Sequence, residues 1–129
     1  MNTKELQLVT FKQAKRLKQL GFDLECYNYY DETQGNILCT NPLICYNDNH
    51  NGDNTYKISA PTVAHALKWF RDAKEFYTSI TFYFSSGQTL YEAVFLNKGG
   101  KIDSSIEFDT YEEAESALLD KLLTVLEKE

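Results

Sequence analysis

The sequence has few of the residues that build metal centres and covalent cross-links. Its 129 residues include only three cysteines and two histidines. No Cys-x-x-Cys pair occurs, and structural zinc sites usually contain one. The set Cys26, Cys39, Cys45 and His50 therefore does not indicate zinc. We expect no bound metal and no cofactor.

A long apolar run is also missing. Nothing near the N-terminus has the length of a signal-peptide core, and no segment approaches the roughly 20 apolar residues of a membrane span. Three cysteines without an export signal favour reduced thiols. We expect a cytoplasmic protein that has no membrane partner.

Sequence motifs for catalysis are absent as well. A Cys–His nucleophile pair would need an orienting residue and a strained loop, and neither has a local signature here. Gly99 and Gly100 join two expected strands, whereas a phosphate-binding loop precedes a helix. We expect a protein that is not an enzyme. A small enzyme is the third hypothesis, and it needs a deep pocket flanked by acids, His65 and either Cys45 or His50.

The segment 41–54 is rich in Asn, Asp and Gly, which predicts an exposed loop. Leu43, Ile44 and Cys45 interrupt its polarity and are candidate anchors. Aligning Gly52 with the turn glycine of a calcium loop puts Ile58 where the bidentate Glu belongs. Too little negative charge is left for calcium, so a solvated loop is the better interpretation.

Charge is uneven along the chain. The net charge is −6, which argues against a general affinity for nucleic acid or anionic membranes. Residues 1–20 nevertheless hold five Lys or Arg against one acid, whereas residues 109–129 hold seven acids against two Lys. Nine Tyr and eight Phe favour strands and a true core over disorder. At this length we expect one domain, residues 1–129.

The clearest helix signal runs over residues 59–75. Ser59 is a good N-cap residue, and Pro61 follows in the first turn, where its missing N–H costs nothing. The apolar face expected for this helix consists of Val63, Ala66, Leu67, Phe70, Ala73 and Tyr77.

Two further helices are predicted, one towards each end of the chain. Thr10 with Gln13 and Thr110 with Glu113 each have the spacing of a capping box. Gly21 supplies the left-handed residue that often ends a helix. The expected apolar stripes are Phe11, Ala14, Leu17 and Leu20 in the first helix, and Tyr111, Ala114, Leu118, Leu122 and Val125 in the last.

The strand pattern predicts a hairpin and a three-stranded meander. The hairpin comprises residues 26–31 and 36–40, and a short strand at 55–58 leads into the central helix. In the meander, Ile80, Phe82 and Phe84 alternate with Ser79, Thr81 and Tyr83, as in a half-buried strand. Residues 89–96 and 101–108 complete it. The expected fold is α+β, with one mostly antiparallel sheet of about five strands and three helices largely on one face.

Three segments also carry a resemblance. They are SAPT at 59–62 with Ala66 and KWFR at 68–71, then QA with LKQLGF at 13–22, and FDTYEEA at 108–114. Together they resemble small uncharacterised proteins of Bacteroides-type bacteria, their integrated mobile elements and their phages. The resemblance implies a stand-alone intracellular domain of mobile-element or phage origin, and it supplies no catalytic residues.

The leading functional hypothesis is a binding or accessory protein that acts through protein–protein contacts. The second face of the meander mixes apolar and polar side chains, so it is either covered by another element or a partner surface. The candidate partner surface consists of Tyr83, Leu90, Glu92 and Val94. The sequence gives neither the partner nor the oligomeric state.

The alternative hypothesis is a nucleic-acid-binding module. The first helix carries candidate phosphate contacts at Lys12, Lys15, Arg16 and Lys18. The neighbouring hairpin has side chains that can stack on bases, namely Tyr27, Tyr29 and Tyr30. The negative charge of the whole chain makes this the less favoured interpretation.

Overall fold

A computed structural model describes residues 7–40, 43, 45–52, 56–97, 99–100 and 102–128. The predicted roles of Ile44, of the loop end at 53–54 and of the strand starts at Thr55 and Lys101 fall outside these residues. The chain divides into two compact units, Met1–Thr62 and Val63–Glu129, and each is described by itself. The expectation of one domain stays a prediction.

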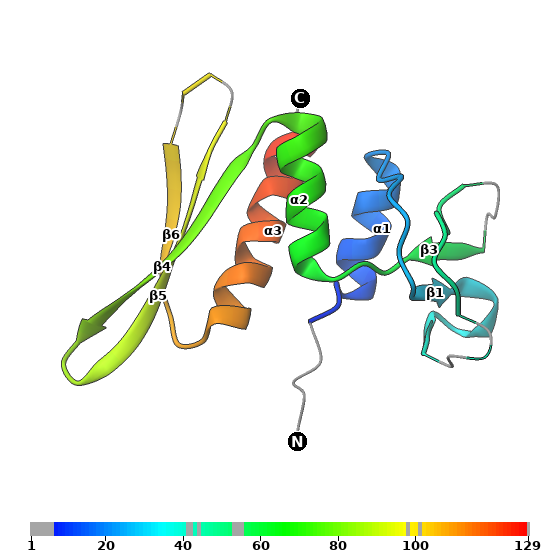
Figure 1. Ribbon diagram of the computed structural model, residues 1–129, viewed down its shortest axis with the longest axis horizontal. Helices are drawn as coiled ribbons and strands as arrows, with labels where there is room; N and C mark the ends of the chain where they lie inside the picture. The colour runs from blue at the N-terminus through cyan, green and yellow to red at the C-terminus, as the bar shows by residue number, and fades with distance from the viewer. Residues whose placement is uncertain are drawn as a thin grey trace. The chain divides into compact units, whose positions relative to one another are not determined.

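The α+β class is confirmed, but the single sheet of about five strands is wrong. The structure has two antiparallel sheets of three strands each, in the orders β2-β1-β3 and β4-β5-β6. The third strand pairs with the first and thereby completes a sheet within Met1–Thr62. The meander consequently forms a sheet of its own (Figure 1). The three helices therefore do not share one face of one sheet.

The first unit begins with helix α1, Phe11–Gln19. Thr10 and Gln13 form the predicted capping box: the Thr10 hydroxyl accepts from the Gln13 N–H, and the Gln13 side chain accepts from the Thr10 N–H. Gly21 adopts the left-handed conformation after the helix, with φ of 95°. Phe22 then lies fully buried, as the apolar contact that often follows such a helix end.

The small sheet of this unit contains β1 (Tyr29–Asp31), β2 (Ile37–Cys39) and β3 (Lys57–Ser59), with a 3-10 turn η1 (Glu32–Gln34) between the first two. The predicted hairpin is confirmed in outline. Ser59, however, is the last residue of β3 and pairs with Tyr29, so its prediction as a helix N-cap is wrong. Ser59 is a residue type that often caps a helix, but its pairing with Tyr29 places it in a strand.

The second unit contains α2 (Val63–Lys74), β4 (Tyr77–Ser85), β5 (Gln88–Leu96), β6 (Ile102–Phe108) and α3 (Tyr111–Glu127). Thr110 caps α3 by accepting from the Glu113 N–H, as predicted. In α2 the buried residues include Trp69, whereas Ala73 is exposed. Tyr77 does not continue the helix, because the chain turns at Glu75, where φ is 59°, and enters β4.

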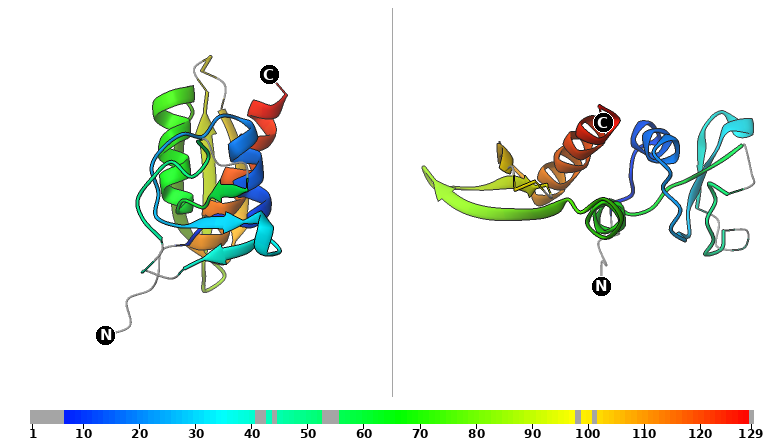
Figure 2. Two further views of the ribbon diagram at one scale, coloured as in Figure 1. Left: turned by 90° about the vertical axis from the view of Figure 1, so that its right-hand side faces the viewer. Right: turned by 90° about the horizontal axis from the view of Figure 1, so that it is seen from above.

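Helix α3 lies along one face of the meander sheet (Figures 1 and 2). Ala93 and Phe95 point to this face and are buried. On β4 the same face carries Phe82 and Phe84, yet their exposed fractions are 62% and 75%. The half-buried pattern predicted for this strand is therefore not followed at these two rings. Strand β6 pairs with β5 only from Tyr91 onwards, so the end of the β4–β5 hairpin extends past the third strand.

Candidate functional site

The four residues predicted as a partner surface lie together on the other face of the meander sheet. Tyr83 and Leu90 are directly paired across β4 and β5, and Glu92 and Val94 follow at two-residue steps along β5. All four are half-buried. Among the described residues of this unit, both helices lie away from this face (Figures 1 and 2). We call these four residues the meander face.

The meander face carries negative charge beside its apolar side chains. The pKa of Tyr83 is raised, first by partial burial and then by the carboxylates of Glu107 and Glu92. Glu107 belongs to an irregular stretch of β6 opposite Tyr91 and Ala93, and its φ is 73°. A partner with apolar side chains and a basic group would complement this face.

The basic residues of α1 differ in how far they are exposed to solvent. Lys12 and Lys15 are exposed, and Arg16 is half-buried. Lys18 is half-buried too, and its Nζ donates to the carbonyl of Lys57 at 2.9 Å. Lys18 therefore holds the helix to the small sheet of its own unit, which leaves Lys12 and Lys15 as the better placed phosphate contacts.

The tyrosines proposed to stack on bases are mostly engaged inside the first unit. Tyr29 is buried. The Tyr30 hydroxyl donates to the Val9 carbonyl at 2.8 Å, and its ring meets Phe11 edge-on. Tyr27 is exposed. Nucleic-acid binding stays a prediction, and this geometry does not favour it.

A buried lysine, which the sequence did not reveal, lies in the first unit. The Lys57 Nζ is 4.6 Å from the centre of the Tyr29 ring, and 5.5 and 5.8 Å from those of Tyr46 and Tyr56. The His50 ring is 4.7 Å from Tyr29. Cation–π contacts of this kind stabilise a desolvated ammonium group. No sequence signal marks the cluster, because Tyr29 and Lys57 come from strands that pair only in the folded chain.

Two thiols lie beside this cluster. Burial raises the pKa of Cys45 to about 11, with a further contribution from the neighbouring Cys39 and an opposing one from Lys57. A hydrogen bond with Cys39, followed by burial, raises the pKa of Tyr29 to about 12. At neutral pH the Cys45 thiol and the Tyr29 hydroxyl are protonated, whereas the nucleophile and metal ligand is the thiolate. The arrangement is that of a structural cluster.

We expect Cys45 to resist alkylation in the folded protein. With a pKa near 11 instead of 9.0, its thiolate fraction at pH 8 is about a hundredfold lower than in the unfolded chain. Iodoacetamide labelling followed by peptide mass spectrometry measures this rate, with labelling in urea as the control. Equal rates in the folded and the unfolded chain would refute the protected thiol.

The raised pKa of Cys45 also means that the free energy of unfolding falls as pH rises from about 9 to 11.

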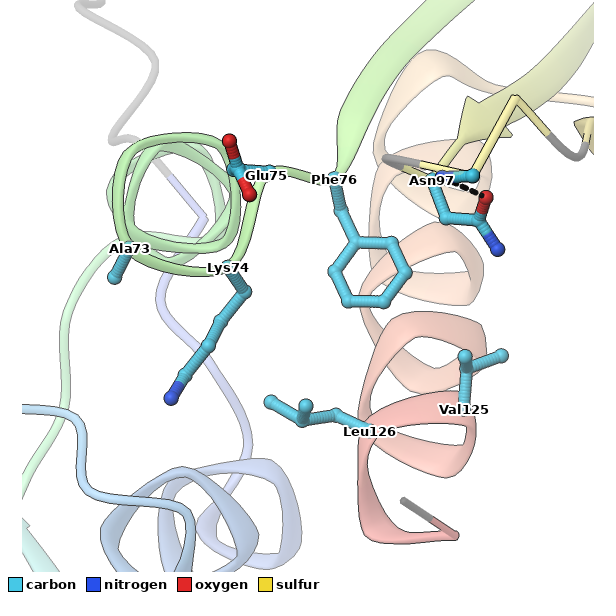
Figure 3. A pocket seen from close by; sticks show the side chains of 8 residues that line it. Ala73, Lys74, Glu75, Phe76, Asn97, Val125 and Leu126 are labelled. Carbon is cyan, nitrogen blue, oxygen red and sulfur yellow. Dashed lines mark hydrogen bonds between the residues drawn. The ribbon is translucent and has the colours of Figure 1, made fainter.

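Two hollows offer space for small molecules. One of about 280 Å³ is lined by residues of the first unit, including Tyr29, Asp31 and Cys39. Another of about 520 Å³ lies in the second unit, where Phe76 and Leu126 face the same space (Figure 3). The residues that line these hollows do not include Cys45, His50 or His65, which the enzyme hypothesis requires.

Among the described residues, no group of three or more His, Cys, Asp or Glu side chains could hold a metal ion. Within the same residues, every helix is too short or too polar to cross a membrane. Comparisons with protein-family models, with curated proteins and with solved structures find no match to this chain.

Proposed function

We propose that this chain is a non-enzymatic binding protein that attaches to a partner protein through the meander face. The single observation that carries the proposal is the asymmetry of the β4–β5–β6 sheet. One face is covered by α3 and buries Ala93 and Phe95. The opposite face presents Tyr83, Leu90 and Val94 around Glu92, and in the described part of the unit no helix lies against it.

The composition of the meander face supports protein contact. Aromatic and aliphatic side chains with a single acid resemble the centre of a protein interface more than a solvated sheet surface. Tyr77 and Leu96 pair with each other at the far end of the same face and are exposed. The apolar character therefore continues along the strands. Glu92 adds a preference for a partner that has a basic group opposite it.

Replacing Val94 by Asp tests the proposal. A charge buried in the interface should reduce capture of the partner from native lysate by about tenfold or more, which corresponds to about 1.4 kcal/mol. Tyr83→Ala should also weaken capture. Thr89→Asp is the matched control, because Thr89 is exposed on the opposite face of β5. Equal capture by Val94→Asp, Thr89→Asp and the unchanged chain would dismiss the meander face.

The remaining expectations belong to the same proposal. A cytoplasmic location is supported by Cys26, Cys39 and Cys45, which are all free thiols, since reducing compartments keep thiols in this state. An origin in a mobile element or a phage has only the resemblance of the helical segments as its support. An accessory protein that binds another protein is compatible with both.

A further inference from the structure

The outer edge of β4 is unusually open for pairing. The strand is nine residues long and lies at the edge of its sheet. Its sequence, YTSITFYFS, contains no charged residue, no proline and no glycine. Its pairing with β5 continues without a shift from Tyr77 to Ser85. Natural edge strands are normally protected from further pairing by charges, prolines, bulges or a covering element.

The turn at the end of the hairpin shows which backbone groups face outwards. Ser86 and Gly87 have φ of 49° and 78°, as in a two-residue type I′ turn. The pair next to such a turn, Ser85 and Gln88, is hydrogen-bonded, and hydrogen-bonded pairs then alternate along the ladder. The residues that direct their N–H and C=O groups away from β5 are therefore Thr78, Ile80, Phe82 and Phe84. Within the described residues no other strand pairs with this edge.

We propose that β4 pairs antiparallel with β4 of a second copy of this chain, with a two-fold axis at Thr81. In this register Ile80 pairs with the second copy's Phe82, and Thr78 with the second copy's Phe84. Each such pair makes two hydrogen bonds, so the four pairs make about eight and use every outward-directed group. A register centred on Ile80 or Phe82 leaves part of the edge without a partner.

The side chains fit this register as well as the backbone does. Paired residues of antiparallel strands point to the same face, so Phe82 and Phe84 gain Ile80 and Thr78 of the other copy as neighbours. These two rings have exposed fractions of 62% and 75% in the single chain. Aromatic and β-branched side chains are favourable cross-strand neighbours. No like charges meet, because β4 has no charge.

This self-matching register favours a second copy over a foreign strand. A strand from another protein would have to supply the same length, the same lack of charge and small or aliphatic residues beside both rings. The inference does not rest on the proposed function, since it uses the edge of the sheet and the proposed function uses the meander face. In the dimer the two sheets join into one, and two meander faces lie side by side.

Cysteine cross-linking tests the register. In the proposed dimer the two copies of Thr81 face each other as a non-hydrogen-bonded pair, within reach of a disulfide. We expect Thr81→Cys to form a covalent dimer in a glutathione buffer, where two thiols are oxidised and one oxidised glutathione is reduced. Ser79→Cys is the matched control. Its two copies lie about 13 Å apart, too far for a disulfide, and should cross-link at least about tenfold more slowly.

A second measurement uses the full chain without added cysteines. Sedimentation should show a dimer whose share grows with protein concentration. Phe82→Pro should make the chain monomeric, because it removes an outward N–H but no hydrogen bond to β5. Phe82→Ala controls for loss of the ring, and fluorescence of Trp69 checks folding. A chain that is monomeric at all concentrations, equal cross-linking of the two cysteine variants, or a dimer unaffected by Phe82→Pro in a folded chain would each overturn the proposal. A monomer that pairs only with a foreign strand would overturn it too.

Discussion

Replacing Phe70 by Ala should lower the free energy of unfolding of the second unit by about 3–5 kcal/mol. The Phe70 side chain is fully buried, with an exposed fraction of 0%. Its ring lies 5.1 Å from Trp69 and 6.1 Å from Phe76, and Phe76 in turn lies 6.0 Å from Phe95 of β5. The substitution thus opens a cavity where α2 and the sheet share one chain of aromatic contacts.

Urea unfolding followed by Trp69 fluorescence measures this effect, since Trp69 is the single tryptophan and belongs to α2. Phe84→Ala is the matched control. It removes the same ring from a site that is 75% exposed in the single chain, so at protein concentrations where the chain is monomeric it should change the free energy of unfolding by no more than about 0.5 kcal/mol. Similar losses for the two variants would show that the end of the hairpin is part of the core.

The exposed ring of Phe84 shows how much an alternating strand pattern can predict. Alternation places Ile80, Phe82 and Phe84 on one face, and the register of β4 with β5 confirms that they share it. Alternation does not show how far the neighbouring helix reaches. Helix α3 starts only after β6 has ended at Phe108, opposite Tyr91. The part of the β4–β5 hairpin beyond Tyr91 is therefore uncovered. How much of the hairpin is covered depends on the lengths of β6 and of its connection to α3, and the pattern in β4 does not contain these lengths.

The division into two sheets was not predictable for a related reason. Local signals located the helices well, because a cap such as Thr10 or Thr110 bonds to a residue only three positions away. Strand partners are distant in sequence. The pairing of Ser59 with Tyr29 removed Ser59 from the helix and placed β3 with the hairpin. A period-two pattern contains no information about which distant strand completes the ladder.

The meander face was the part of the candidate site that the sequence could supply. Tyr83 and Leu90 flank a turn marked by Gly87, so their pairing follows from hairpin geometry. The Lys57 cluster was out of reach, because a lysine is ordinarily an exposed residue and three tyrosines from separate segments surround this one. The contacts of the Asn-rich loop were out of reach for the same reason. Its composition predicts solvent exposure, whereas its partners are distant in sequence.

Asn51 belongs to that loop, and we expect it to stabilise the first unit far more than its place in a polar loop predicts. Its side-chain amide donates to the Phe22 carbonyl at 3.0 Å, and its side-chain oxygen accepts from the Ser59 N–H at 2.9 Å. Ser59 is fully buried, so Asn51→Ala leaves a buried N–H without its partner. We expect a loss of about 2–4 kcal/mol in the free energy of unfolding, because the Ser59 N–H loses its acceptor and the Phe22 carbonyl loses a donor.

Amide hydrogen exchange at Ser59, measured by NMR, together with urea unfolding followed by circular dichroism, tests this expectation. Exchange at Ser59 should accelerate in Asn51→Ala. Asn51→Asp keeps an oxygen for the Ser59 N–H but turns a second acceptor towards the Phe22 carbonyl, so exchange at Ser59 should stay slow although the free energy of unfolding still falls. Asn47→Ala is the control: Asn47 donates to Glu25 at an exposed site, and its loss should stay within about 0.5 kcal/mol. If Asn51→Ala behaved like Asn47→Ala, the loop would be a solvated connection, as its composition suggests. A large difference would instead mean that one amide in this loop joins the end of α1 to the edge of β3.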